Sequence, residues 1–147
     1  KSIDDYIVLI SNDDVVVLTP GWDDLVKEHF KDESVAAVGA TSNYVLSHQL
    51  YDTKGPEIEF VSCLSFFWIA VSRRAIDQVG LLDESFGLGL CEDLDWCVRA
   101  KQCGFRLILD RRLRVHHWGS QTFRRMGVDT QALDLKNRAL LKEKHSL

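Results

Sequence analysis

The sequence predicts an α/β fold in a single domain that spans residues 1–147. Residues 6–39 alternate as strand, loop, helix and strand, an order typical of α/β proteins. Hydrophobic residues make up 46% of the chain and charged residues 27%, the balance of a globular protein rather than a disordered or fibrous one. A chain of about 150 residues also buries roughly two thirds of its unfolded surface, which is enough to form a core.

The first elements follow from apolar runs and from the polar residues that end them. Residues 6–10 read Tyr-Ile-Val-Leu-Ile, which predicts a strand buried on both faces in a parallel sheet. A helix is expected to start with Thr19 as its N-cap and Pro20 at its first position. The run Val-Ala-Ala-Val-Gly at residues 35–39 predicts the next strand.

The remaining elements are assigned from periodicity and from the glycines that end helices. No internal repeat and no linker-like stretch divides them, in keeping with one domain. We expect a surface loop at 40–57, one buried strand or two at 60–71, a helix at 73–79, a glycine-bearing loop at 81–90, a helix at 92–102, strands at 105–109 and 113–116, and an amphipathic helix at 129–144.

Charge and cysteine content disfavour several classes of protein. The formal net charge is -4, whereas a non-specific nucleic-acid binder is usually strongly basic, so we expect no nucleic-acid partner. None of the four cysteines forms a C-x-x-C pair, which disfavours a structural zinc site, and we interpret them as free thiols. No apolar run reaches the roughly 20 residues of a membrane helix and no leader is visible. The expected location is the cytoplasm, free or peripheral at the inner face of the membrane.

The first candidate site is the polar segment after the strand at residues 6–10. Asn12, Asp13 and Asp14 lie there, and ligands of open α/β sheets collect beyond the carboxyl ends of strands. Adjacent carboxylates repel each other unless a cation neutralises them, and oxygen ligands suit Mg²⁺ or Mn²⁺. The alternative is a simple turn, because Asn and Asp are common turn residues.

An acidic cluster opens the expected helix at residues 92–102. A carboxylate at a helix N-terminus is stabilised by the helix dipole, which explains Asp95 without any function. Three acids within four residues exceed what capping needs. Glu92 or Asp93 could therefore act as a general base that takes a proton from a hydroxyl.

A third candidate site combines two histidines with arginines that follow them. A neutral imidazole can join carboxylates around a divalent transition metal. Adjacent strand residues point to opposite faces, so one histidine faces a given site, and we favour His117 over His116 because Gly119 lets the chain turn toward a ligand. Arg124, or its neighbour Arg125, could reach a diphosphate from the segment that follows.

Several short segments occur in a distinctive order along the chain. They are Ile-Ser-Asn-Asp-Asp at 10–14, Pro-Gly-Trp at 20–22, Val-Ala-Ala-Val-Gly at 35–39, Val-Gly-Leu-Leu-Asp-Glu-Ser-Phe at 79–86, Glu-Asp-Leu-Asp-Trp-Cys-Val-Arg-Ala at 92–100 and Val-His-His-Trp-Gly-Ser at 115–120. This order resembles that of the family 2 glycosyltransferases with the GT-A fold. The resemblance implies a mixed sheet with flanking helices. It also implies inverting transfer of a sugar from a nucleotide-sugar donor to a hydroxyl of a glycan, lipid-linked or protein acceptor.

The resemblance further implies roles for individual residues. Asp14 matches the ligand of Mn²⁺ or Mg²⁺, and His117 matches the histidine that helps to hold the metal or the diphosphate. Asp13 is expected near the ribose or diphosphate, and Asn12 stands where many members have Asp. Asp93 matches the general base of inverting members.

Glu92 would orient the acceptor or the base.

The N-terminal side of the chain departs from the family. In the family, a βαβα stretch that holds the nucleotide base precedes the metal-binding strand, whereas residues 1–5 alone precede that strand here. We therefore expect an N-terminally truncated GT-A fold, either a fragment or a chain whose sheet is completed by a second copy or a partner chain. The alternative function is a non-catalytic module that binds a glycan or protein partner. A metal-dependent nucleotidyltransferase ranks last, because no Gly-rich or Lys-bearing phosphate loop is present.

Overall fold

The computed structural model describes residues 6–45, 47–119 and 121–146, and it has a six-stranded mixed sheet flanked by helices. The strands are β1 (Ile7–Ser11), β2 (Val15–Val17), β3 (Val35–Ser42), β4 (Ile58–Val61), β5 (Trp68–Ser72) and β6 (Arg106–His117). The helices are α1 (Trp22–His29), α2 (Arg73–Val79), α3 (Glu92–Gln102), α4 (Gln121–Met126) and α5 (Thr130–His145), with a short 3₁₀ turn at Glu84–Phe86. The predicted α/β class is confirmed.

The sheet runs in the order β1-β5-β3-β6-β2, and β4 pairs with the first half of β6 beside β2. Among the described strands, β3 and β6 pair in parallel and the other pairs are antiparallel. Because β3 and β6 run in the same direction, the residues that follow them meet at the same end of the sheet. β1 and β2 lie at opposite edges, so the turn that joins them crosses that same end.

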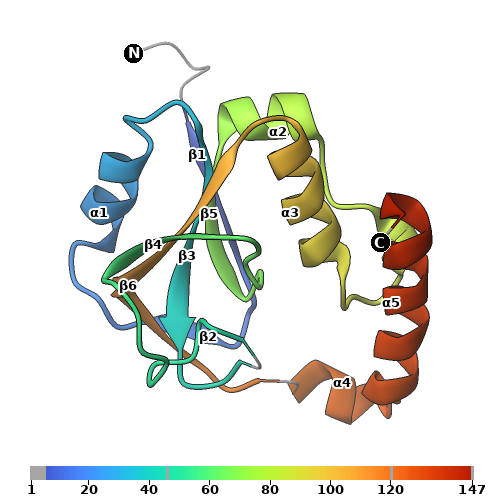
Figure 1. The fold of residues 1–147 in the computed structure, drawn as a ribbon. Coiled ribbons are helices and arrows are strands. Elements are labelled where there is room, and N and C mark those ends of the chain that lie inside the picture. The colour runs from blue at the N-terminus through green and yellow to red at the C-terminus, as the bar shows by residue number, and fades with distance from the viewer. Residues whose placement is uncertain (1–5, 46, 120, 147) are drawn as a thin grey trace.

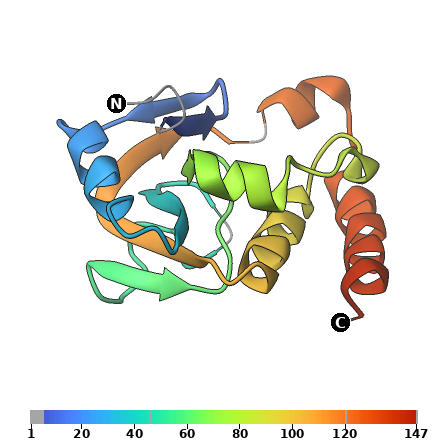
Figure 2. The same cartoon turned by 90° about the horizontal axis from the view of Figure 1, so that it is seen from above.

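Helices cover both faces of the sheet (Figures 1 and 2). On one face α1 buries Val26 against β3 and β6, together with Trp68 of β5. On the other face α2 and α3 enclose a second cluster, to which α3 contributes Trp96 and Cys97. α5 forms an outer layer beyond α3, where Leu141 packs with Phe86 and Cys91. No helix in the described ranges is long and apolar enough to cross a bilayer.

The strand at the start of the chain is confirmed, but its predicted environment is wrong. β1 pairs antiparallel with β5 and forms an edge of the sheet. Its side chains alternate in exposure, and Ile7 and Leu9 are 36% and 40% exposed. An apolar run therefore marks a strand here without marking burial on both faces.

The predicted start of the first helix is also wrong. α1 begins at Trp22, with Gly21 in the left-handed region as its N-cap. The hydroxyl of Thr19 donates to the carbonyl of Arg112 and accepts from the N–H of Arg114, so it is used to fix the chain to β6. A side chain committed to a neighbouring strand cannot cap the helix.

Two later assignments need correction, and the helices at 73–79 and 92–102 are confirmed. Residues 40–57 are not wholly a surface loop, because β3 continues to Ser42 and Gln49 is fully buried. The side chain of Gln49 donates to the carbonyl of Ala40 and accepts from the N–H of Ser65, so it holds this segment against the sheet. The two strands expected at 105–116 are one long strand, β6, whereas residues 60–71 contribute to two strands, β4 and β5, which was one of the two alternatives expected there.

Candidate functional site

A cavity of about 440 Å³ opens at the end of the sheet where β3 and β6 finish. Its wall includes Asn12, Asp13 and Asp14 from the β1–β2 turn, Glu92 and Asp93 from the start of α3, and His117 from the end of β6. Its volume lies in the range of roughly 300 to 1,000 Å³ that is usual for small-molecule sites. The structure therefore brings six of the seven predicted site residues into one cavity.

Asp14 and His117 face each other across the β2–β6 pair. Val15 lies opposite His117 in the antiparallel register, and the N–H of Trp118 donates to the carbonyl of Asp14 at 3.1 Å. This backbone pairing places Asp14 Oδ1 3.1 Å from His117 Nε2. The short strand β2, which the sequence pattern did not predict, thus fixes the geometry of the pair.

The hydrogen bonds of His117 define which of its ring nitrogens faces the cavity. Nδ1 lies 3.2 Å from the carbonyl oxygen of Tyr44, an acceptor, so Nδ1 carries the proton in the neutral ring. Nε2 then presents a lone pair toward Asp14 and lies 3.3 Å from the side-chain amide of Asn12. Asn43 holds the backbone of His117 by accepting from its N–H at 2.7 Å and donating to its carbonyl at 3.2 Å.

This arrangement fits a divalent metal ion. A histidine that ligates a metal usually donates its other ring N–H to a carbonyl or carboxylate, as His117 does to Tyr44. Asp14 adds a carboxylate oxygen on the same side. Within the described residues no group of three or more His, Cys, Asp and Glu side chains is placed to hold a metal, so an ion bound here would take two protein ligands from this pair and its others from a bound ligand or water.

Glu92 and Asp93 enter the cavity from the first turn of α3. Burial is the main factor that raises the pKa of Asp93, although Asp93 Oδ1 accepts the N–H of Leu94 at 2.8 Å. Burial also raises the pKa of Glu92, and the nearby charge of Asp93 raises it further. Glu92 Oε2 is buried and has no hydrogen-bond partner among the described residues. Both carboxyls are thus better proton acceptors than exposed ones.

Asp95 has a different role from its two neighbours. It is fully buried and accepts from Arg99 at 2.8 Å, Lys144 at 2.7 Å and His145 at 2.8 Å. Two of these partners belong to α5, so Asp95 joins α3 to α5. The expectation that Asp95 is structural agrees with this placement, although two of its three side-chain partners lie in α5 and the third, Arg99, lies one turn along α3.

Arg124, the seventh predicted site residue, and His116, the alternative to His117, do not line the cavity. Arg124 is exposed on α4, whose neighbouring residue Phe123 lines the cavity. His116 is not part of the cavity wall, and its ring packs against Trp118 with ring centroids 4.4 Å apart. Ser120, the last residue of the family-like segment, lies outside the described residues.

Several residues of the site were not predicted from the sequence. Tyr44 and Asn43 support His117, although they belong to the segment that we expected to be a surface loop. For the aromatic cluster at 66–68 the sequence favours a place in the core, with the alternative that one ring lines an acceptor groove. Phe66 and Phe67 both line the cavity, and Phe67 stacks on His117 with ring centroids 5.6 Å apart. The topology of the sheet is the feature that could have identified them, because residues that follow two neighbouring parallel strands lie at the same end of a sheet.

No protein-family model matches this chain, and no curated protein matches it. The interpretation of the site therefore depends on its own geometry.

Proposed function

We propose that this chain is a glycosyltransferase domain of the GT-A type that transfers a sugar from a nucleotide sugar to an acceptor hydroxyl with inversion. The observation that carries the proposal is that Asp14, Asp93 and His117, from three distant segments, line one cavity. Asp14 and His117, which are of the residue types that bind metal ions, thus line the same cavity as two partly buried carboxyls with raised pKa values, a combination that suits this reaction.

In this proposal the donor diphosphate lies beside the β1–β2 turn. Asp14 and His117 would hold Mn²⁺ or Mg²⁺, and the imidazole ligand favours Mn²⁺. The bound ion would neutralise the charge that develops on the departing diphosphate. Asp13 and the amide of Asn12 lie on the same wall and would contact the diphosphate or ribose. Arg124 stays a candidate for this diphosphate, although its side chain lies outside the wall.

On the acceptor side, Asp93 takes the proton of the acceptor hydroxyl as its oxygen bonds to the anomeric carbon. The bond from that carbon to the diphosphate oxygen breaks, and the nucleoside diphosphate leaves with the electron pair. A raised pKa brings Asp93 closer to neutral pH, where a general base is most effective. Glu92, adjacent to it, would orient the acceptor.

The exposed edge of β1 is where a base-binding part of the sheet would pair, from a longer chain, a second copy or a partner chain. Unpaired backbone groups on an apolar edge strand favour pairing with another strand. The proposed acceptors are a glycan, a lipid-linked molecule or a protein. The proposed location is the cytoplasm, free or at the inner face of the membrane.

The first test is calorimetric titration of UDP-, GDP- and dTDP-sugars against the chain with Mn²⁺ and with EDTA. We expect binding that requires the metal and is lost in Asp14→Ala. Asp24→Ala is the matched control, because Asp24 is a carboxylate on α1 with an 83% exposed side chain. Binding without metal, or equal loss in the control, would contradict the metal site.

The second test separates catalysis from binding. Asp93→Asn should abolish sugar transfer while metal-dependent binding of the nucleotide sugar is kept. Loss of binding together with transfer would show that Asp93 is structural. A chain that binds no nucleotide under any metal condition, but still binds a glycan or protein, would instead be the non-catalytic module.

A further inference from the structure

The side chain of Asn137, on α5, contacts the loop that leads into Glu92 and Asp93. Asn137 is fully buried. Its Nδ2 donates to the carbonyl oxygens of Phe86 at 2.9 Å, Gly89 at 2.8 Å and Leu90 at 2.9 Å. Its Oδ1 has no hydrogen-bond partner among the described residues, so the described hydrogen bonds of this side chain all go to the loop.

The orientation of this amide is fixed by its surroundings. Three carbonyl oxygens converge on one atom of the side chain, and a carbonyl oxygen at that position would face three like dipoles. The atom must therefore be the nitrogen. An aspartate of the same shape would place a carboxylate oxygen against the same three acceptors.

The loop needs such a partner because its backbone is strained. Leu90 and Cys91 have φ values of 70° and 76°, in the left-handed region that residues with a Cβ rarely adopt. Gly87 and Gly89 on the same loop also have positive φ, at 69° and 124°. This conformation turns carbonyls inward, where neither a helix nor a strand provides a donor, and Glu92 follows directly.

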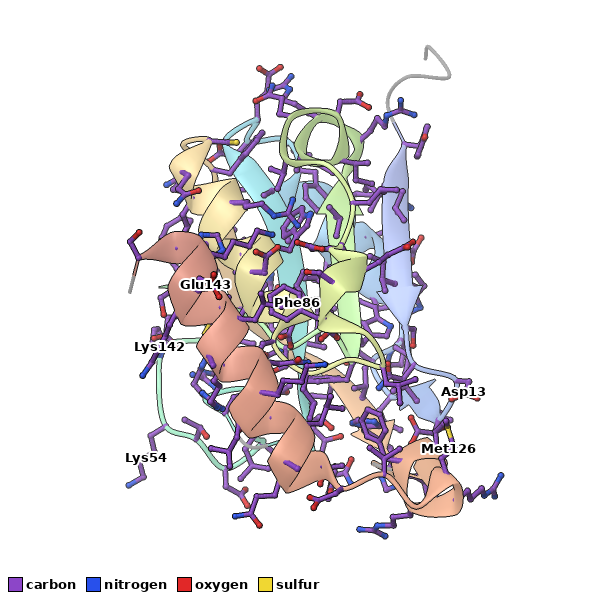
Figure 3. The ribbon with its side chains drawn as sticks, turned by 90° about the vertical axis from the view of Figure 1, so that its right-hand side faces the viewer. Asp13, Lys54, Phe86, Met126, Lys142 and Glu143 are labelled. Carbon is purple, nitrogen blue, oxygen red and sulfur yellow. The ribbon has the colours of Figure 1, made fainter. Side chains whose placement is uncertain are left out.

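α5 is itself held firmly against this region. Leu141, one turn after Asn137, packs with Phe86 and Cys91, and Figure 3 shows Phe86 beside α5. At the far end of α5, Lys144 and His145 bind the buried Asp95 of α3. The amide of Asn137 thus projects from a helix that Leu141, Lys144 and His145 fix to its surroundings.

We propose that Asn137 is a positioning residue that sets the place of Glu92 and Asp93 in the cavity by holding the strained loop of residues 86–91. The inference rests on the proposed function for its catalytic consequence. Asn137 does not line the cavity, so its effect reaches the reaction through the loop. Its loss should lower kcat while metal-dependent binding at Asp14 and His117 is unchanged.

The test compares Asn137→Ala and Asn137→Asp with Val26→Ala in the 147-residue chain. Val26 is buried on α1 against the opposite face of the sheet, so its truncation lowers stability without touching the loop. Three quantities are measured: kcat and KM with the nucleotide sugar that the wild type uses, Kd for Mn²⁺ and UDP, and amide hydrogen exchange across residues 84–95. For both Asn137 variants we expect kcat to fall by about 100-fold. We also expect an unchanged Kd and faster exchange confined to residues 87–93.

The inference is overturned if exchange in the loop is no faster than in Val26→Ala, or if kcat falls no further than in that control. A wild-type kcat in Asn137→Asp would also overturn it, because a side chain of the same shape without the amide donor would then be enough to hold the loop. A wild-type chain that transfers no sugar would refute the proposed function separately. The exchange measurement would then decide alone whether Asn137 holds the loop.

Discussion

Replacement of Asp95 by alanine should destabilise the fold strongly, because it removes the shared partner of Arg99, Lys144 and His145. Removing one member of a buried ion pair typically costs about 3 to 5 kcal/mol. Arg99 keeps the carbonyls of Val79 and Leu81, at 2.6 and 2.8 Å, and Lys144 keeps Asp83 at 2.5 Å. His145, with a 5% exposed side chain, is left most isolated. We therefore expect the lower end of the range, about 3 kcal/mol.

Urea unfolding followed by tryptophan fluorescence measures this loss directly. For a domain of this size, a loss of about 3 kcal/mol corresponds to a fall in Tm of roughly 6 to 12 °C. The control is Asp23→Ala, which removes the equivalent (i, i+4) partner of Lys27 from an exposed helix surface and should change little. Equal effects of the two substitutions would refute the argument that burial makes the Asp95 network strong.

The effect of Asp95→Ala should depend on pH. Burial alone would raise the pKa of Asp95, but hydrogen bonds from Lys144, His145 and Arg99 outweigh it and lower the pKa below the ordinary value. A carboxyl with a lowered pKa stabilises the fold above its unfolded pKa of about 4, and this contribution is lost as the pH falls through the folded pKa. The difference in free energy of unfolding between wild type and Asp95→Ala should therefore become smaller in acid. A difference that grows below about pH 4 would contradict the assignment of a charged Asp95 in the folded protein.

Two further predictions concern the thiols and the turn after His117. Burial raises the pKa of Cys97 to about 12, so a thiol reagent such as DTNB should modify exposed Cys103 in the folded chain and reach Cys97 only after unfolding. Gly119→Ala should weaken metal-dependent nucleotide binding, measured by calorimetry. The reason is that Gly119 has φ of 68° and a Cβ there would overlap the ring of Tyr44, whose carbonyl orients His117. The left-handed backbone alone should cost about 1 to 2 kcal/mol, measured by urea unfolding.

Helices were predictable where local chemistry defines both ends. α2 starts where the hydroxyl of Ser72 accepts the N–H of Ala75 and ends at Gly80, and its bounds match the prediction. α5 starts after Asp129, whose carboxylate accepts two backbone N–H groups. Such signals lie within a few residues of the element that they define. Thr19 carried the same signal, but its hydroxyl is satisfied by β6, which a local pattern cannot reveal.

The site was predictable only in part for a similar reason. Residues at strand ends and helix starts, such as Asp14 and Asp93, can be identified because their chemistry is visible in their own segment. Asn43 and Asn137 carry no such mark, since an isolated asparagine is common in turns and on helices. Their roles depend on the parallel pairing of β3 with β6 and on the packing of α5 against α3. Figure 3 shows Asp13, from the β1–β2 turn, and Met126, from α4, toward the same end of the molecule, although they are far apart in the sequence.

Asp93 provides a final prediction, opposite in sign to that for Asp95 on the same helix. Burial raises the pKa of Asp93, so its charged form destabilises the fold at neutral pH. Asparagine carries no charge and can still accept the N–H groups of Leu94 and Phe66 that Asp93 accepts. Asp93→Asn should therefore be more stable than wild type at pH 7 while it loses transfer, as expected where a buried charge serves function.

The stabilisation by Asp93→Asn should disappear in acid. Below the unfolded pKa of about 4, wild-type Asp93 is protonated in both the folded and the unfolded state, so the penalty of its charge is absent. As the pH rises toward the raised folded pKa, the penalty grows and then becomes constant. Urea unfolding of both proteins from about pH 3.5 to 8 measures this difference. If Asp93→Asn is less stable than wild type at pH 7, the carboxyl contributes to the fold and its assignment as a base loses its physical support.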